Sequence, residues 1–263
     1  MISTVLQGRC GNNFYQIAML LAYCKQHDLP HYIPDIAHHC DGTKMYFPYM
    51  TMGPELGHMT EYHELQVHAT PNGDGTHNYN VPEYRSIPVM ENVKFVGYWQ
   101  SFKYFDWCRD YILEKFQLPY NKNGVVGIHC RFGDFTQLRD KHPELPNEYY
   151  ISAVKYFINQ GYTTFHIFSD DVPAARKYFD NVKWDTDIII WAYEASGKRT
   201  ELNDLTDLSS CEHQILCYST FGFVAGWLNK NPDKHIIIPP SKYCFSGANK
   251  DFIPDYFTQL EFE

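Results

Sequence analysis

Residues 125–134 read VVGIHCRFGD, an apolar run that ends in a cluster of polar and charged side chains. The apolar and β-branched residues of Val125–Cys130 predict a buried strand, because a strand covered on both faces does not alternate with polar residues. Arg131 and Asp134 follow where this strand runs into a loop. The stretch therefore predicts an inner strand of a parallel sheet with charged groups just beyond its carboxyl end.

Downstream of this stretch, short apolar strands alternate with helical patterns. The expected elements are strand 125–130, helix 148–160, strand 164–169, helix 172–179, strand 187–191, helix 202–211, strand 214–218, helix 223–228 and strand 235–239. Such alternation predicts an α/β fold, a parallel sheet with helices on both faces. Ligands of these sheets bind beyond the carboxyl ends of the strands.

The N-terminal part is less regular. Ile2–Leu6 predicts a strand that enters a glycine turn, and Phe14–Lys25 has apolar residues at helical spacing. Residues 34–88 are rich in Gly, Pro, His, Asn and Tyr and predict loops with short strands. A strand over 93–100 and a helix over 104–118 come next, before a linker at 121–124 that marks a domain boundary.

Composition limits the class of protein. The chain has 263 residues, 44% hydrophobic and 17% aromatic, so it can bury a sizeable core. A formal charge of -9 argues against nucleic acid as a partner, because phosphate binding needs an excess of Lys and Arg. Eight scattered cysteines, no signal-peptide pattern and no long apolar run predict a cytoplasmic protein with no membrane span.

The first polar cluster contains Arg131. Its guanidinium suits a diphosphate, since Arg binds phosphate oxygens bidentately without a metal. The alternative is a structural ion pair between Arg131 and Asp134 that caps the strand.

The second cluster, FHIFSDD at 165–171, ends a strand with two adjacent carboxylates. One of them, Asp170 or Asp171, can accept hydrogen bonds from guanine, and the other is expected to cap the following helix.

The third cluster, Ser219, Thr220 and Phe221, precedes a helix. Hydroxyls and N–H groups at a helix N-terminus form an anion site, and an N-cap by Ser219 or Thr220 is the alternative. The histidines of residues 38–68 lack the spacing of a zinc site, so no metal site is predicted.

Five stretches together resemble the α-1,2-fucosyltransferases, glycosyltransferase family 11. They are GRCGNNFYQ at 8–16, GYWQSFKYF at 97–105, HCRFGD at 129–134, FSDD at 168–171 and the long block at 204–229. They occur in the family's order over about nine-tenths of the chain.

The resemblance implies a GT-B-like fold, two Rossmann-like halves with parallel sheets facing a cleft. Residues 1–122 would form the acceptor-side domain and residues 123–263 the nucleotide-sugar-binding domain. It also implies inverting transfer of L-fucose from GDP-β-L-fucose to a hydroxyl of an acceptor glycan, O-2 by analogy. Neither a metal nor another cofactor is expected.

The same resemblance assigns residue roles. Arg131 would hold the β-phosphate, Ser219, Thr220 and Phe221 would add phosphate contacts, His129 with Asp170 or Asp171 would lie at the nucleoside, and Asn12 would lie near the cleft. Asp134 is a candidate catalytic base, with the ion pair to Arg131 as its alternative role.

Two departures from the family pattern concern the donor. Phe132 replaces the second Arg of the third motif, and Gly222-Phe223-Val224 replaces Ser-Trp-Trp. A transferase for another nucleotide sugar and a non-catalytic sugar-binding protein on this scaffold are therefore alternatives.

Overall fold

The computed structural model describes residues 1–33, 36–38, 44–46, 63–67, 84–116, 118, 124–133, 143, 145–184, 187–192, 201–244 and 250–262. The chain divides into two units. The first comprises Met1–Gln117 and Gly247–Pro254, and the second comprises Leu118–Ser246 and Asp255–Glu263. The segment Gly247–Pro254 thus belongs to the first unit. The predicted single boundary between residues 122 and 123 would have assigned this segment to the second unit.

The first unit contains a small parallel sheet and a long helix. Its elements are β1 (Ile2–Thr4), α1 (Cys10–His27), β2 (Ile36–His38), β3 (Lys44–Tyr46), β4 (His63–Val67), β5 (Val93–Gly97), two 3-10 helices (Phe102–Tyr104 and Asp106–Cys108), α2 (Arg109–Phe116) and a 3-10 helix at Lys250–Phe252. The parallel sheet has the order β1-β5-β4, and β2 pairs with β3 antiparallel.

A group of aromatic rings packs along α1. Phe14 and Tyr15 on this helix contact Phe105, each with ring centroids 5.8 Å apart, and Tyr15 also contacts Phe102 at 5.0 Å. Burying such rings stabilises the unit mainly by removing apolar area from water.

The predicted helix over 104–118 is wrong in its first turns. Phe105 has φ −139° and ψ −7°, which interrupts the chain between the two 3-10 helices. The Trp107 indole N–H donates to the Tyr104 carbonyl at 3.2 Å and occupies that acceptor. The α-helix therefore begins only at Arg109.

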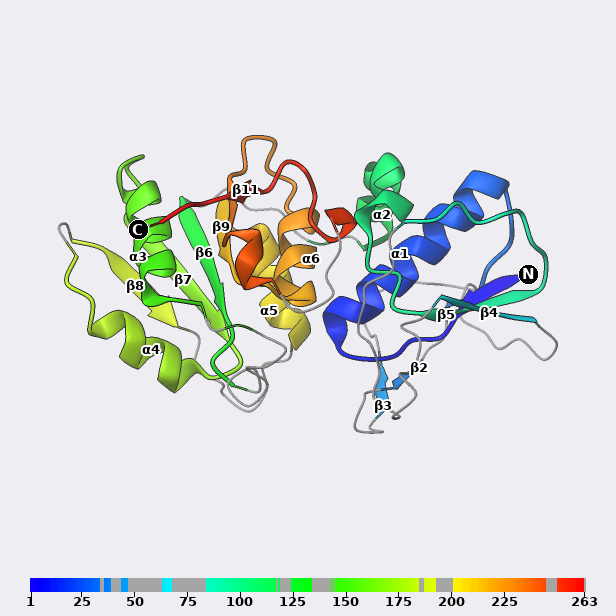
Figure 1. The fold of residues 1–263 in the computed structure, drawn as a ribbon, viewed down its shortest axis with the longest axis horizontal. Helices are drawn as coiled ribbons and strands as arrows, with labels where there is room; N and C mark the ends of the chain where they lie inside the picture. Colours follow the sequence, from blue (N-terminus) through cyan, green and yellow to red (C-terminus); the bar gives the residue numbers. More distant parts are fainter. Residues whose placement is uncertain are drawn as a thin grey trace. The chain divides into compact units, whose positions relative to one another are not determined.

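The second unit is a six-stranded parallel sheet with helices on both faces. Its elements are β6 (Val125–Cys130), α3 (Asn147–Ile158), β7 (Thr164–Ser169), α4 (Val172–Asp180), β8 (Ile189–Ala192), α5 (Glu201–Ser210), β9 (His213–Leu216), α6 (Thr220–Leu228), β10 (Ile236–Ile238), a 3-10 helix at Ser241–Tyr243 and β11 (Thr258–Gln259). The strand order is β11-β10-β9-β6-β7-β8 (Figure 1).

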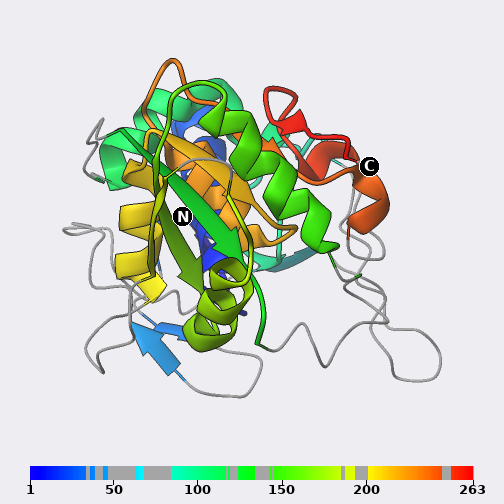
Figure 2. The ribbon, with the colours of Figure 1, turned by 90° about the vertical axis from the view of Figure 1, so that its left-hand side faces the viewer.

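The helices of this unit form two layers around the sheet. Figure 2 shows α3 and α5 on opposite sides of the strands. One core contains Phe157 of α3 and Phe179 of α4 against β6 and β7, whereas Leu208 of α5 approaches Gly127 from the other face. A Cβ at Gly127 would lie 2.6 Å from the Leu208 side chain, so glycine permits this close packing.

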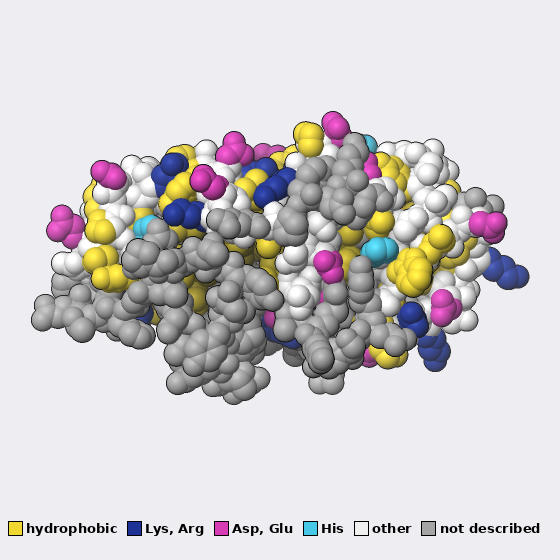
Figure 3. All heavy atoms as spheres, turned by 180° about the vertical axis from the view of Figure 1, so that it is seen from behind, with side chains coloured by type: hydrophobic (Ala, Val, Ile, Leu, Met, Phe, Trp, Pro, Cys, Tyr) yellow, Lys and Arg dark blue, Asp and Glu magenta, His cyan; other side chains and the backbone are white. Residues whose placement is uncertain are grey.

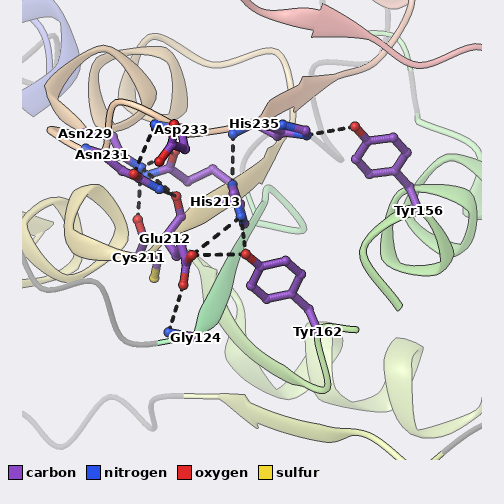
Figure 4. Close-up of polar contacts among 11 residues, drawn as sticks. Gly124, Tyr156, Tyr162, Cys211, Glu212, His213, Asn229, Asn231, Asp233 and His235 are labelled. Atoms are coloured by element: carbon purple, nitrogen blue, oxygen red, sulfur yellow. Dashed lines mark hydrogen bonds and ion pairs between the residues drawn. The ribbon is translucent and has the colours of Figure 1, made fainter. Parts of the chain in front are cut away.

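A polar network ties together the starts of β6, β9 and β10 (Figure 4). Glu212 accepts hydrogen bonds from the Tyr162 hydroxyl at 3.0 Å and from the Gly124 N–H at 3.1 Å. The His235 N–H donates to Nδ1 of His213 at 2.9 Å, so Nε2 carries the proton in neutral His213 and donates to Tyr162 at 2.6 Å. These bonds satisfy polar groups at the amino ends of the strands, at the edge opposite Arg131.

The surface of the described residues is mixed in character. In the coloured part of the face shown in Figure 3, Lys and Arg side chains alternate with Asp and Glu, and apolar side chains form separate patches. Among the described residues, no helix has the length and apolar character that crossing a membrane requires.

Candidate functional site

The carboxyl ends of three neighbouring strands bring the predicted site residues together. Strand β6 pairs with β7 on one side and with β9 on the other. The residues that follow Cys130, Ser169 and Leu216 therefore share one edge of the second unit's sheet. This edge is where parallel α/β sheets bind ligands.

Asp170 holds the loop that follows β6. Its Oδ2 lies 3.1 Å from Nε of Arg131, and its Oδ1 accepts the N–H groups of Phe132 and Gly133 at 3.0 and 3.1 Å. A Cβ at position 133 would lie 2.6 Å from Oδ2, so glycine allows the carboxylate to approach. The Arg131 and Asp170 side chains are 12% and 17% exposed, which leaves the guanidinium shielded but within reach of a ligand.

Asp171, the adjacent carboxylate, caps α4. Its Oδ1 accepts the Ala174 N–H at 2.9 Å, and its own N–H donates to the Ser169 hydroxyl at 3.1 Å. The capping alternative is thus the one the structure shows for Asp171. The two neighbouring carboxylates have different partners, one in the loop at Arg131 and one in a helix.

His129 is buried beneath the first turn of α6. Its Nδ1 lies 3.4 Å from Sγ of Cys217, and its ring packs on Phe221 with centroids 5.2 Å apart. A Cβ at Gly222 would lie 2.7 Å from Nδ1, so only glycine leaves space for the imidazole. Burial, together with the Arg131 charge, lowers the pKa of His129 to about 3. The ring is therefore neutral at physiological pH and adds no charge of its own beside Arg131.

Cys217 and Gly222 are contacts of His129 that the sequence patterns did not single out. Gly222 was visible only as a departure from the family pattern, and Cys217 as one of the scattered cysteines. Their role depends on which side chain packs against them, which a linear spacing does not contain.

The start of α6 completes the edge. Ser219 takes the N-cap position with extended backbone and a buried side chain, and its hydroxyl makes no capping hydrogen bond. Thr220 and Phe221 are partly exposed in the first turn, where backbone N–H groups have no acceptor within the helix. Those N–H groups and the helix dipole favour an anion at this position.

Phe132 packs against aromatic rings of α3 and α4. Its ring centroid is 5.8 Å from that of Tyr178 and 6.5 Å from that of Tyr150. The aromatic side chain at this position therefore joins the core of the second unit, while its N–H supports Asp170.

The predicted roles of two further site residues, Asn12 and Asp134, are not tested by the geometry at this edge. Asn12 belongs to the first unit, where its Oδ1 accepts Nε2 of Gln100 at 2.7 Å. Asp134 lies outside the described residues. The nucleotide role of Asn12 and the catalytic role of Asp134 remain predictions.

Residues of the N-terminal motif at 8–16 have partners within their own unit. Gln16 donates to the Gly97 carbonyl at 2.9 Å and accepts the Gln7 N–H at 3.0 Å, while Asn13 donates to the Gln7 carbonyl at 2.8 Å. Gly8 has φ +81°, a conformation that favours glycine, and a Cβ there would lie 2.4 Å from Asn12. This motif therefore joins the ends of β1 and β5 to α1.

The fold and this edge define a two-unit α/β protein whose second unit presents a fixed guanidinium and a helix N-terminus at the carboxyl ends of its strands. Comparison with protein families identifies the family to which this α/β protein belongs. The chain belongs to glycosyl transferase family 11, whose sequence profile matches residues 1–245. The resemblance inferred from the motifs is thereby confirmed.

Curated relatives are similar at low identity. The O-antigen biosynthesis glycosyltransferase WbnK of Escherichia coli is 31% identical over 54% of this chain and 46% of its own length. An alpha-1,2-colitosyltransferase of E. coli is 27% identical over 62% and 60%, and human galactoside alpha-(1,2)-fucosyltransferase 1 is 25% identical over 84% and 63%. The matches thus span about half to less than two thirds of the length of these relatives.

A solved structure shares the fold. POFUT1 in complex with GDP superposes with a TM-score of 0.50 at 12% identity, over 90% of this chain and 97% of that one. The predicted α/β class, with parallel sheets of the GT-B kind in both units, is confirmed. The placement of the two halves about a cleft remains a prediction.

Proposed function

We propose that this chain is an inverting, metal-independent glycosyltransferase that transfers L-fucose from GDP-β-L-fucose to a hydroxyl of an acceptor glycan, O-2 by analogy. Family membership supports glycosyl transfer, and the names of relatives support fucose and the 1,2 linkage. The GDP complex of POFUT1 supports a GDP-linked donor.

The observation that carries the proposal is the fixed position of Arg131. Asp170 holds its Nε, and the guanidinium lies close enough to His129 and Cys217 to influence the pKa of both. Because His129 packs beneath the first turn of α6, the cation and the helix N-terminus belong to one site. Together they offer a guanidinium and free N–H groups, which are the two donors that a diphosphate needs.

This arrangement favours departure of a diphosphate. In the proposed reaction the acceptor oxygen attacks the anomeric carbon as the bond from that carbon to the β-phosphate oxygen breaks. GDP leaves with the bonding electrons, and the acceptor hydroxyl gives its proton to a base, for which Asp134 is the candidate. Arg131 stabilises the charge that develops on the β-phosphate, which is most effective when the donor is held in place beforehand.

The test is titration of GDP in the presence of EDTA with wild type, Arg131→Ala and Arg131→Lys, alongside turnover of GDP-fucose. We expect the Ala variant to lose GDP affinity and to lower turnover by about 10²-fold or more, with partial retention by Lys. The matched control is Arg176→Ala, which removes an exposed cation from α4 of the same unit. Absence of GDP binding by the wild type would point to another donor or to a non-catalytic scaffold.

A second donor is favoured by a specific observation. The colitosyltransferase relative aligns over 62% of this chain, and Phe132 makes the loop after β6 less cationic than the family pattern. If both sugars are carried on GDP, binding of GDP alone does not separate the two donors. Parallel turnover of GDP-fucose and GDP-colitose by the same preparation therefore decides between them.

The proposed setting is the cytoplasm. All seven cysteines in the described part of the chain are free thiols, as is usual in a reducing compartment. Fractionation of cells that express the full chain, with a cytoplasmic marker, tests this.

A further inference from the structure

The first unit contains a cavity that shares no residue with the edge described above. It has a volume of about 340 Å³, within the range of small-ligand pockets. Met19 and Tyr23 of α1 form part of its floor, together with Tyr104. These three side chains are almost fully buried, so this part of the lining is held in place by its packing.

Two exposed aromatic side chains line the same cavity. Tyr84 is 44% exposed and Trp107 is 55% exposed. The Trp107 indole N–H donates to the Tyr104 carbonyl at 3.2 Å, so the only polar group of this ring is already used. Its exposed surface is therefore apolar, and covering it with a ligand is favourable.

One wall of the cavity is held in place at several points. The Tyr84 N–H donates to Asp251 at 2.9 Å, and the Arg85 N–H donates to the Tyr104 hydroxyl at 3.3 Å. The Tyr23 hydroxyl also accepts a hydrogen bond from the Met90 N–H and donates one to the Pro88 carbonyl, both at 2.9 Å. A wall that is ordered before binding lowers the entropy cost of holding a ligand.

Three exposed polar side chains also line the cavity. Gln26, Arg85 and Ser86 line the cavity and are exposed, and none of their side chains has a hydrogen-bond partner among the described residues. They offer an amide, a guanidinium and a hydroxyl to a ligand, and the described lining contains no carboxylate.

We propose that this cavity binds a sugar residue of a glycan. A pyranose ring presents an apolar C–H face that packs on an aromatic ring, and hydroxyls at its edge that pair with polar groups. The Trp107 and Tyr84 rings meet the first requirement, and Gln26, Arg85 and Ser86 meet the second. A lipid chain would leave the polar side chains of the lining unpaired, and a nucleoside diphosphate would meet a single cation in the described lining. That the glycan is the acceptor of the transfer rests on the proposed function.

The experiment is saturation-transfer NMR of the full chain with lactose, cellobiose and maltose as probes, followed by titration of the sugar that gives a signal. We expect Trp107→Ala to weaken its binding about tenfold and Trp107→Phe to retain most of it, because the ring face provides the contact. The matched control is Trp191→Ala, which removes another exposed Trp, 59% exposed and in the second unit. Circular dichroism of each variant verifies folding.

Three outcomes overturn this inference. The first is the absence of a saturation-transfer NMR signal from all three disaccharides. The second is an equal loss of sugar affinity in the Trp107 and Trp191 variants. The third is displacement of the sugar by GMP in a manner that depends on Trp107. GDP titration of the same samples separates the test of this cavity from the test of the proposed function. Sugar binding without GDP binding would leave the cavity assigned and reject the proposed transfer.

Discussion

Asp170 holds Arg131 and its loop through both carboxylate oxygens, one 3.1 Å from the guanidinium Nε and the other accepting two backbone N–H groups. The two residues lie 39 positions apart and meet because β6 and β7 are neighbours in the sheet. A carboxylate thus fixes the cation that the proposed reaction requires.

Asp170→Ala is expected to weaken GDP binding about tenfold, because the guanidinium and the 131–133 loop lose their support. The matched control is Asp171→Ala, which removes only the cap of α4. It should lower the free energy of unfolding by about 1 kcal/mol and leave GDP affinity unchanged. Calorimetric titration and urea denaturation of both variants measure these effects. Equal GDP affinities would contradict the positioning role of Asp170.

Gly222→Ala is expected to destabilise the second unit by roughly 1–3 kcal/mol, because the new methyl would meet the buried His129 ring. Removing the ring should relieve the conflict, so the cost of Gly222→Ala should shrink in a His129→Ala background. A double-mutant cycle by urea denaturation measures this coupling. If the losses of unfolding free energy are additive, the methyl group at position 222 does not clash with the His129 ring.

The pKa of His129 predicts a pH dependence of stability. Its pKa is lowered to about 3 in the folded chain and returns toward about 6.5 on unfolding, so the unfolded chain binds the extra proton between these values. Stability should therefore fall as pH falls through this window. Between about pH 6.5 and pH 4.5 the contribution of this group amounts to roughly 2 kcal/mol.

Urea denaturation of the wild type and of His129→Gln across this range isolates the contribution of the histidine. The variant should lose less stability on acidification than the wild type. Parallel curves of unfolding free energy against pH would be inconsistent with a buried neutral His129.

Tyr162→Phe is expected to lower the free energy of unfolding by about 1–3 kcal/mol. The change leaves His213 Nε2–H and Glu212 Oε1 without the hydroxyl that joins them (Figure 4). Tyr156→Phe is the control, because its hydrogen bond to His235 is exposed and water can replace the hydroxyl. Thermal and urea unfolding measure both. GDP affinity should stay unchanged, since this network lies at the amino ends of the strands.

The regular part of the fold could be predicted because its strands are buried on both faces. Strands β6 and β7 have the predicted bounds, and the helices between 147 and 228 lie within a few residues of the expected ranges. The start of α6 was placed too late, at 223 instead of Thr220. The extended backbone of Ser219 sets that start, and an apolar pattern does not contain it.

The sequence by itself determined the alternation of strands and helices, the family and the set of polar residues at the strand ends, because apolar periodicity and motif order are local properties. It could not show which carboxylate pairs with Arg131, nor that Asp171 caps a helix while Asp170 supports the loop. Those roles depend on strand order and on side-chain packing between segments far apart in the chain. Only the tertiary structure fixes such distances, and it likewise brings Tyr84 and Trp107 to one cavity.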